Sequence, residues 1–223
     1  MKNVQRHDNW IDALWSLTRV LYYFLGLPCL LFLALASLVG IFGNTMVRAD
    51  GGYYFFSALL WAAIIIPLGY RRFSIVSRRR QLKKMVALLT SDERFSPQKQ
   101  HQVLDAGRSK YLGIDTKNGT MLYIHMVKKG FVDVIGLTMD DWSDSEQEGS
   151  TLRIKTKNPD VPELSINAHQ IVTRELFNAL SAMSHNSYSE PFPKEPWPLH
   201  VGIQSRFVEF EHNVVVPQAA NLA

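Results

Sequence analysis

The chain of 223 residues contains a single cysteine, Cys29, which lies inside a long apolar run. One cysteine excludes a disulfide framework within the chain and a metal site built from several cysteines. This usage fits a domain that is kept in a reducing compartment. The length leaves room for one ordinary domain and a smaller part beside it.

The sequence also lacks the common motifs of enzymes. It has no glycine-rich phosphate loop, no HExxH and no GxSxG. Ser184-His185 does not indicate a nucleophile, because that chemistry also needs a positioned third group and an oxyanion hole. No histidine stands at metal-ligand spacing with another; the seven are His7, His101, His125, His169, His185, His200 and His212. We therefore predict no enzyme activity and no catalytic, cofactor-binding or metal-binding residues.

Charge is absent from two apolar runs, residues 21–42 and 53–70. At about 1.5 Å of helix per residue, the first can cross about 30 Å of hydrocarbon, and the second is close to the minimum of about 17 residues. A glycine- and asparagine-rich segment between them indicates a tight turn. We predict a transmembrane hairpin over residues 21–72. The alternatives are two helices buried in a soluble protein, or a signal peptide cleaved near Ala34-Leu35-Ala36.

Acidic residues are absent from the basic block that follows the second run. Its members are Arg71, Arg72, Arg78, Arg79, Arg80, Lys83 and Lys84. Without these seven charges the net charge of +4 becomes −3, so the basicity is local. By the positive-inside rule, the block predicts an anchor in the bacterial inner membrane with both termini in the cytoplasm. No nucleic-acid recognition motif accompanies it, so we expect no specific nucleic-acid partner.

The first 20 residues contain two tryptophans, Trp10 and Trp15, at helical spacing with other apolar residues. We expect these tryptophans to anchor a short helix in the membrane interface. The alternative is that the same helix extends the first membrane span.

The pattern changes after the basic block. Residues 73–108 indicate a basic juxtamembrane helix and then a proline break. Residues 110–166 indicate strands, with Asn118-Gly119 at a hairpin turn, and residues 168–183 have one apolar helical face. The fold class is therefore α+β. An antiparallel sheet closed by a C-terminal helix, over residues 109–185, resembles the bacterial pleckstrin-homology-like (PH-like) domains, which bind lipids, peptides or other proteins.

Two further features are candidates for a partner surface. Residues 143–149 are expected to form a polar turn that is either a solvated hairpin or a docking patch for a basic partner. The acids in and before this turn are Asp140, Asp141, Asp144, Glu146 and Glu148. The tail, residues 186–223, starts with closely spaced prolines, so we expect an extended segment and then a possible edge strand. Trp197, among these prolines, is either a packing anchor or a recognition handle.

The layout of the whole chain, with stretches such as MKNVQRHDNW and YLGIDTKNGTMLYIH, is similar to that of the entry-exclusion proteins of I-complex conjugative plasmids. In that family, a protein at the inner membrane of the recipient blocks redundant transfer by recognising a transfer-apparatus membrane protein of the donor. The resemblance implies an interaction protein and no catalytic residues. The rival prediction is a membrane-tethered PH-like module that binds anionic lipid and has no role in conjugation. The oligomeric state is left open.

Overall fold

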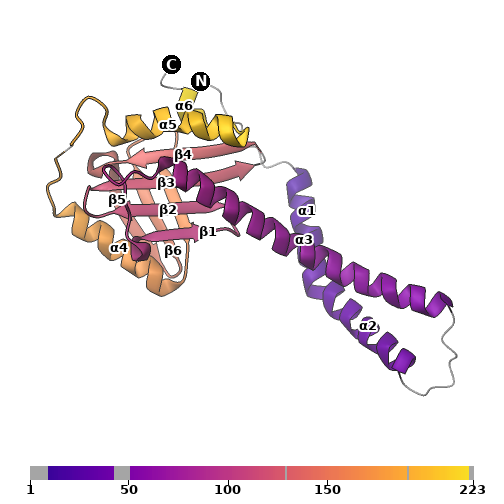
Figure 1. Cartoon of the computed structure of the whole chain (residues 1–223). Helices are drawn as coiled ribbons and strands as arrows, with labels where there is room; N and C mark the ends of the chain where they lie inside the picture. The colour runs from indigo at the N-terminus through magenta and orange to yellow at the C-terminus, as the bar shows by residue number, and fades with distance from the viewer. Residues whose placement is uncertain (1–9, 43–50, 129, 190, 221–223) are drawn as a thin grey trace. The chain divides into compact units, whose positions relative to one another are not determined.

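The computed structural model describes residues 10–42, 51–128, 130–189 and 191–220. The chain divides into two compact units between Ser74 and Ile75. Over the described residues, the element order is three helices, then seven strands and three further helices, with short π-helical and 3-10 turns among them. Figure 1 labels these elements along the chain.

The N-terminal unit is helical. Helix α1 (Trp10–Leu21) continues through a π-helical turn (Tyr22–Gly26) into α2 (Leu27–Phe42) without a break. The helix expected before the first apolar run is therefore continuous with the helix that contains this run. Trp10 and Trp15 belong to α1, but their side chains lie outside the described residues.

Within the described residues, two helices are long and apolar enough to cross a membrane, Leu17–Phe42 and Gly51–Leu89. In the most apolar 18-residue stretch of each helix, only 11% of the first and 17% of the second is buried. A helix in the core of a soluble protein would be mostly buried, so this low burial favours the predicted membrane helices over that alternative. The second helix, α3 (Gly51–Leu89), contains both the second apolar run and the basic block. The predicted turn between the helices lies mainly outside the described residues.

Small and polar side chains join α2 to the first part of α3. The Ser37 and Ser57 hydroxyls are 3.0 Å apart, and the Tyr53 hydroxyl donates to the Ser37 carbonyl oxygen at 3.0 Å. A Cβ atom at Gly40 would overlap the Tyr53 hydroxyl, so glycine allows this close approach. Such contacts are the ones that associate helices in hydrocarbon, where apolar burial gives no advantage.

The first sheet of the C-terminal unit is antiparallel and has the order β1-β2-β3-β4. Its strands are β1 (Gln102–Asp105), β2 (Lys110–Asp115), β3 (Thr120–Lys128) and β4 (Phe131–Leu137). The predicted hairpin turn is confirmed between β2 and β3. The Asp115 carboxylate accepts the backbone N–H of Lys117 at 2.9 Å, and Gly119 takes the positive φ of +68° that such turns need.

The second sheet has the order β5-β6-β7, with β5 (Trp142–Glu148), β6 (Thr151–Thr156) and β7 (Glu163–Asn167). The acidic turn predicted at residues 143–149 is wrong, because most of it is strand β5 and the chain turns only at Gly149-Ser150. After Trp142, the inward positions of β5 are polar, Ser145 and Gln147. The sequence therefore lacks the alternation of apolar residues that identifies a half-buried strand.

One hydrophobic core lies between the two sheets and helix α4 (Gln170–Ser184), whose position agrees with the predicted helix. Leu112 and Tyr123 come from the first sheet, and Ile154 and Ile166 come from the second. Leu176, Leu180 and Met183 of α4 supply the third side of this core. The α+β class is confirmed, with two antiparallel sheets closed by a helix (Figure 1).

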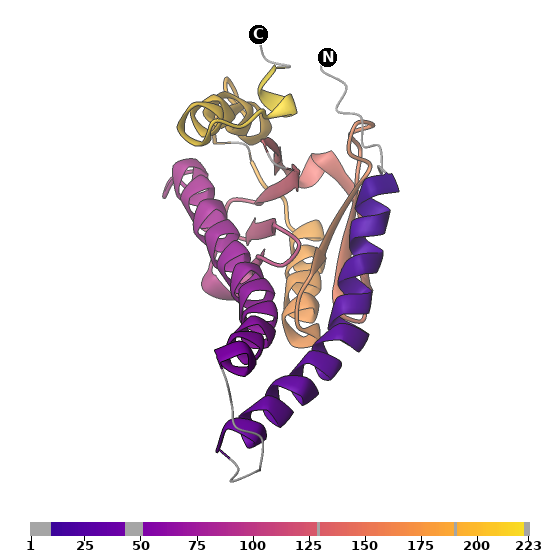
Figure 2. The same ribbon diagram turned by 90° about the vertical axis from the view of Figure 1, so that its right-hand side faces the viewer.

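A second core covers the other face of the first sheet. It is formed by the end of α3, by α5 (Trp197–His212) and by α6 (Pro217–Ala220), which pack on strand residues such as Leu122 and Val134. Helices α4 and α5 therefore lie on opposite faces of this sheet (Figure 2).

The edge strand predicted after the prolines of the tail is wrong, because helix α5 extends over residues 197–212. Pro198 stands in the first turn of this helix, where its missing N–H costs nothing, and Asn213 ends the helix in the left-handed conformation. The many β-branched and aromatic residues favoured a strand in the sequence. Only Val215, after the helix, forms a parallel bridge with Phe131.

Gly136 in β4 provides a test of the packing under α5. A Cβ atom there would lie 2.6 Å from a Val201 methyl group and 3.1 Å from the Trp197 indole nitrogen. We expect Gly136→Ala to lower the free energy of unfolding by about 1–3 kcal/mol through overpacking, measured by urea denaturation. Gly69→Ala is the control, because a Cβ atom at Gly69 meets nothing within 4 Å. Equal stability of the two variants would contradict this packing.

Candidate recognition surface

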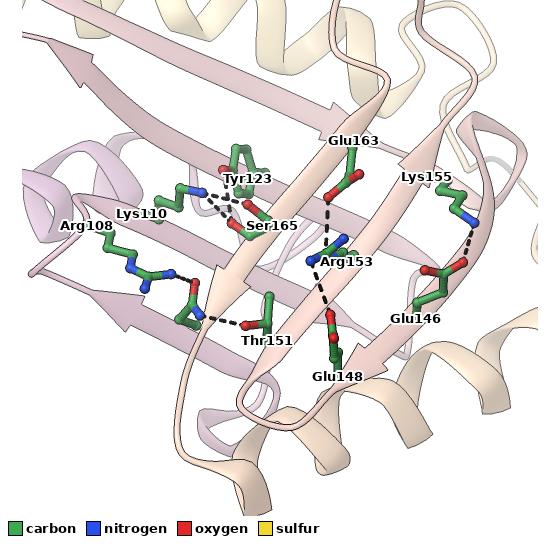
Figure 3. Close-up of polar contacts among 11 residues, drawn as sticks. Arg108, Lys110, Tyr123, Glu146, Glu148, Thr151, Arg153, Lys155, Glu163 and Ser165 are labelled. Atoms are coloured by element: carbon green, nitrogen blue, oxygen red, sulfur yellow. Dashed lines mark hydrogen bonds and ion pairs between the residues drawn. The ribbon is translucent and has the colours of Figure 1, made fainter. Parts of the chain in front are cut away.

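The outer face of the second sheet is covered by charged side chains. Strands alternate the direction of their side chains, so residues two apart on each strand share this face. Its acids are Asp144, Glu146 and Glu148 of β5 and Glu163 of β7. Arg153 and Lys155 of β6 lie between them (Figure 3). Below, these six residues are called the charged face.

Ion pairs link the three strands across the charged face. The Arg153 guanidinium lies 3.2 Å from Glu148 and 3.8 Å from Glu163. The Lys155 ammonium is 3.3 Å from Asp144 and also pairs with Glu146, and these two hydrogen bonds raise the pKa of Lys155, Glu146 having the larger effect. Four carboxylates and two cations leave an excess of two negative charges. All six side chains are 44–77% exposed, so solvent screens the pairs and they add little to stability.

Polar contacts between β7 and the first sheet hold the charged face in place. The Lys110 ammonium donates to the carbonyl and hydroxyl oxygens of Ser165, both at 2.8 Å (Figure 3). Arg108 donates to the Asn167 side-chain oxygen, and the Asn167 amide donates to the Thr151 hydroxyl at 2.7 Å. Burial lowers the pKa of Lys110, and the neighbouring Arg108 charge lowers it further.

The predicted acidic cluster is divided in the structure. Asp144, Glu146 and Glu148 share the charged face, whereas Asp141 caps the short turn Met139–Asp141 by accepting the backbone N–H and the hydroxyl of Thr138, both at 2.7 Å. Asp140 is exposed in the same turn. The prediction omitted Arg153, Lys155 and Glu163, although Leu152 and Ile154 alternate with the two cations and indicated that these point outward.

Trp197 is a packing anchor, and its prediction as a candidate surface residue is wrong. Its side chain is only 2% exposed and stacks on Phe95 with ring centroids 5.1 Å apart. Its indole N–H donates to the Met121 carbonyl oxygen at 2.8 Å.

The proline-rich segment before Trp197 is held by a small polar cluster. The His200 ring nitrogen Nδ1 forms a hydrogen bond with the Glu195 carboxylate at 2.6 Å. This hydrogen bond lowers the pKa of the Glu195 carboxyl, and the Arg94 charge lowers it by a smaller amount. The Arg94 guanidinium also donates to the Glu195 carbonyl oxygen at 2.8 Å and lies over the Phe192 ring. The segment is therefore fixed to the domain at this point.

The predicted membrane-anchor cations all belong to α3 and are exposed. The Arg71 guanidinium lies 4.9 Å from the centre of the Tyr23 ring. Leu82 and Met85 are buried in the second core, whereas Lys83 and Lys84 between them point to solvent. This part of α3 is thus amphipathic, with a basic outer side.

The family model for exclusion-determining proteins matches residues 1–220, nearly the whole chain. The chain belongs to this family. No curated protein and no solved structure matches it. The resemblance to entry-exclusion proteins is thereby confirmed, and this is not a family of enzymes. Among the described residues, no three His, Cys, Asp or Glu side chains are grouped so that they could hold a metal ion.

Proposed function

We propose that this entry-exclusion protein is anchored in the inner membrane of the recipient cell by the hairpin of residues 21–72. Both termini face the cytoplasm, and the C-terminal unit recognises a membrane protein of the donor's transfer apparatus. The related plasmid whose entry it blocks belongs to the I-complex. The charged face is the surface that makes the contact.

The anchoring is supported by the exposed apolar helices and by the charge that follows them. Side chains such as Phe32, Phe55 and Ile66 are 73%, 71% and 67% exposed, which is unfavourable in water and favourable in hydrocarbon. Arg71 and Arg72 follow directly after Tyr70, where cations meet anionic headgroups on the cytoplasmic side.

Recognition by the charged face is supported by its position and its chemistry. The two antiparallel sheets closed by α4 are compatible with the PH-like fold that the sequence suggested, and by analogy with such domains we infer that the unit binds another molecule. The six side chains project from paired strands, so they are held more firmly than loop residues are. Exposed charges discriminate well between related partners, since a wrong pairing places like charges together.

A lipid-binding function is the second candidate, and the basic side of α3 favours it. The charged face has an excess of negative charge and would be repelled by anionic lipid, so lipid would bind elsewhere on the unit. If lipid binding without a role in conjugation were the function, the wild-type chain itself would not exclude any plasmid. Mating of recipients with and without the wild-type chain therefore separates the two candidates.

Topology is tested with reporter fusions. We expect a cytoplasm-active reporter to work after Ala223 and a periplasm-active reporter to work after Asn44. A periplasmic signal after Ala223 would contradict the proposed orientation.

A further inference from the structure

Helix α5 has an apolar stripe on its outer side. Its inner residues, among them Trp197, Val201 and Val208, pack on the first sheet. Ile203, Phe207 and Phe210 follow one another at helical spacing and are 39%, 59% and 91% exposed. Two largely exposed phenylalanines one turn apart are uncommon on a soluble domain and indicate a surface that something covers.

Contacts of α3 and of the residues just after it show at which end of the C-terminal unit α5 begins. At one end, Arg94 and Phe95, just after α3, contact Glu195 and Trp197 at the start of α5. At the other end, Arg78 of α3 donates to the Ser109 hydroxyl at 3.4 Å. Helix α5 therefore begins where α3 has ended.

The end that contains Arg78 is also the end that α5 reaches. Met126 donates its N–H to the Ser109 carbonyl oxygen, and Met126 faces Val132 across the β3–β4 ladder. The Val132 N–H in turn donates to the carbonyl oxygen of Val215, three residues after α5. Phe207 and Phe210, in the last turns of α5, thus lie toward the Arg78 end of the unit.

This end of the unit is rich in exposed cations. Arg78, Lys128 and Arg206 are exposed, and the Lys128 ammonium lies 4.7 Å from the centre of the Phe131 ring. The exposed acid in the last turn of α5 is Glu211. Phenylalanines bordered by Arg and Lys are the composition of surfaces that lie in the interface of an anionic membrane.

We propose that the outer side of α5, with Phe207 and Phe210 inserted, rests on the anionic lipid surface of the membrane in which the chain is anchored. Arg78 comes eight residues after Tyr70, the last residue of the apolar run, on the same helix α3. The domain then has a second membrane contact, which limits its rotation about α3. This inference rests on the anchoring proposed above.

The test uses the full chain in vesicles of phosphatidylglycerol and phosphatidylcholine. In a Cys29→Ser background, Phe210→Cys is labelled with an environment-sensitive fluorophore, and Lys194→Cys, exposed at the opposite end of α5, is the matched control. We expect lipid-borne quenchers to reduce the emission at position 210 at least twofold more than at position 194. The difference should shrink in vesicles of phosphatidylcholine alone, and also when Arg206→Glu is added.

Three outcomes would overturn the inference, and they are distinguishable. If the protein floats with the vesicles but the probe at position 210 remains in water, the second contact is wrong and the anchoring stands. If the protein does not float with vesicles at all, the anchoring and the second contact both fail. If the probe is shielded but not quenched by lipid, and unlabelled Phe210→Cys chains form disulfide-linked pairs, a second copy covers the stripe instead.

Discussion

Trp197→Ala is expected to lower the free energy of unfolding of the C-terminal unit by about 3–5 kcal/mol, as deletions of large buried aromatic side chains do. The indole is 2% exposed, stacks on Phe95 and donates a hydrogen bond to Met121. Its removal opens a cavity between α5 and the first sheet and leaves the Phe95 ring without its stacking partner. Urea denaturation of the full chain in detergent, followed by circular dichroism, measures the change.

Trp197→Phe is the matched control for this experiment. It keeps an aromatic ring beside Phe95 and removes the indole N–H that Met121 accepts, so we expect a smaller loss of about 1–2 kcal/mol. A loss below about 1 kcal/mol in Trp197→Ala would contradict the buried position and favour a recognition role for this residue.

Reversal of two charges on the charged face is expected to abolish most of the exclusion. In Glu146→Lys/Glu148→Lys, the new cations stand beside Lys155 and Arg153, so the excess charge of the face becomes positive. A partner surface complementary to the native face then meets like charge. We expect transfer of the related plasmid into recipients that carry this variant to rise at least about tenfold over the wild type, measured as mating frequency.

The control for this variant carries the same total change of charge on other surfaces. Glu93 and Glu175 are both exposed, Glu93 after α3 and Glu175 on α4. Recipients with Glu93→Lys/Glu175→Lys should exclude the plasmid as the wild type does. If the two double variants behave alike at equal protein levels, the charged face is not the site of recognition.

Much of the fold could be predicted, because local patterns determine it. The β2–β3 hairpin was predicted from Asn118-Gly119 with strand-like residues on both sides, and α4 from an apolar face at helical spacing. Both elements face the first core, so their patterns are strong.

Other elements could not be predicted, because tertiary contacts decide them. Strand β5 has polar residues on both sides after Trp142, and only its pairing with β6 makes it a strand. Helix α5 is rich in β-branched and aromatic residues and forms a helix because Trp197 and Val201 fit the surface of the first sheet. The sequence gives no local sign of that fit.

Only the acidic residues of β5 in the charged face were predicted, because tertiary contacts bring in the other members. The many acidic residues in the segment 140–148 indicated Asp144, Glu146 and Glu148 as candidate surface residues. Their partners Arg153 and Lys155 come from β6, and a strand pairing that was not predicted brings the two sets together. Trp197 was named among surface residues because the prolines around it suggested an extended, exposed segment, whereas Pro198 begins a helix that buries the indole.

Mating experiments test whether this chain, when it is present in the recipient, excludes a related conjugative plasmid. Recipients that express the full chain, and recipients that do not, are mated with donors of an I-complex plasmid and with donors of an unrelated conjugative plasmid. We expect a large drop in transfer of the I-complex plasmid alone. Equal transfer of both plasmids into both kinds of recipient would contradict it.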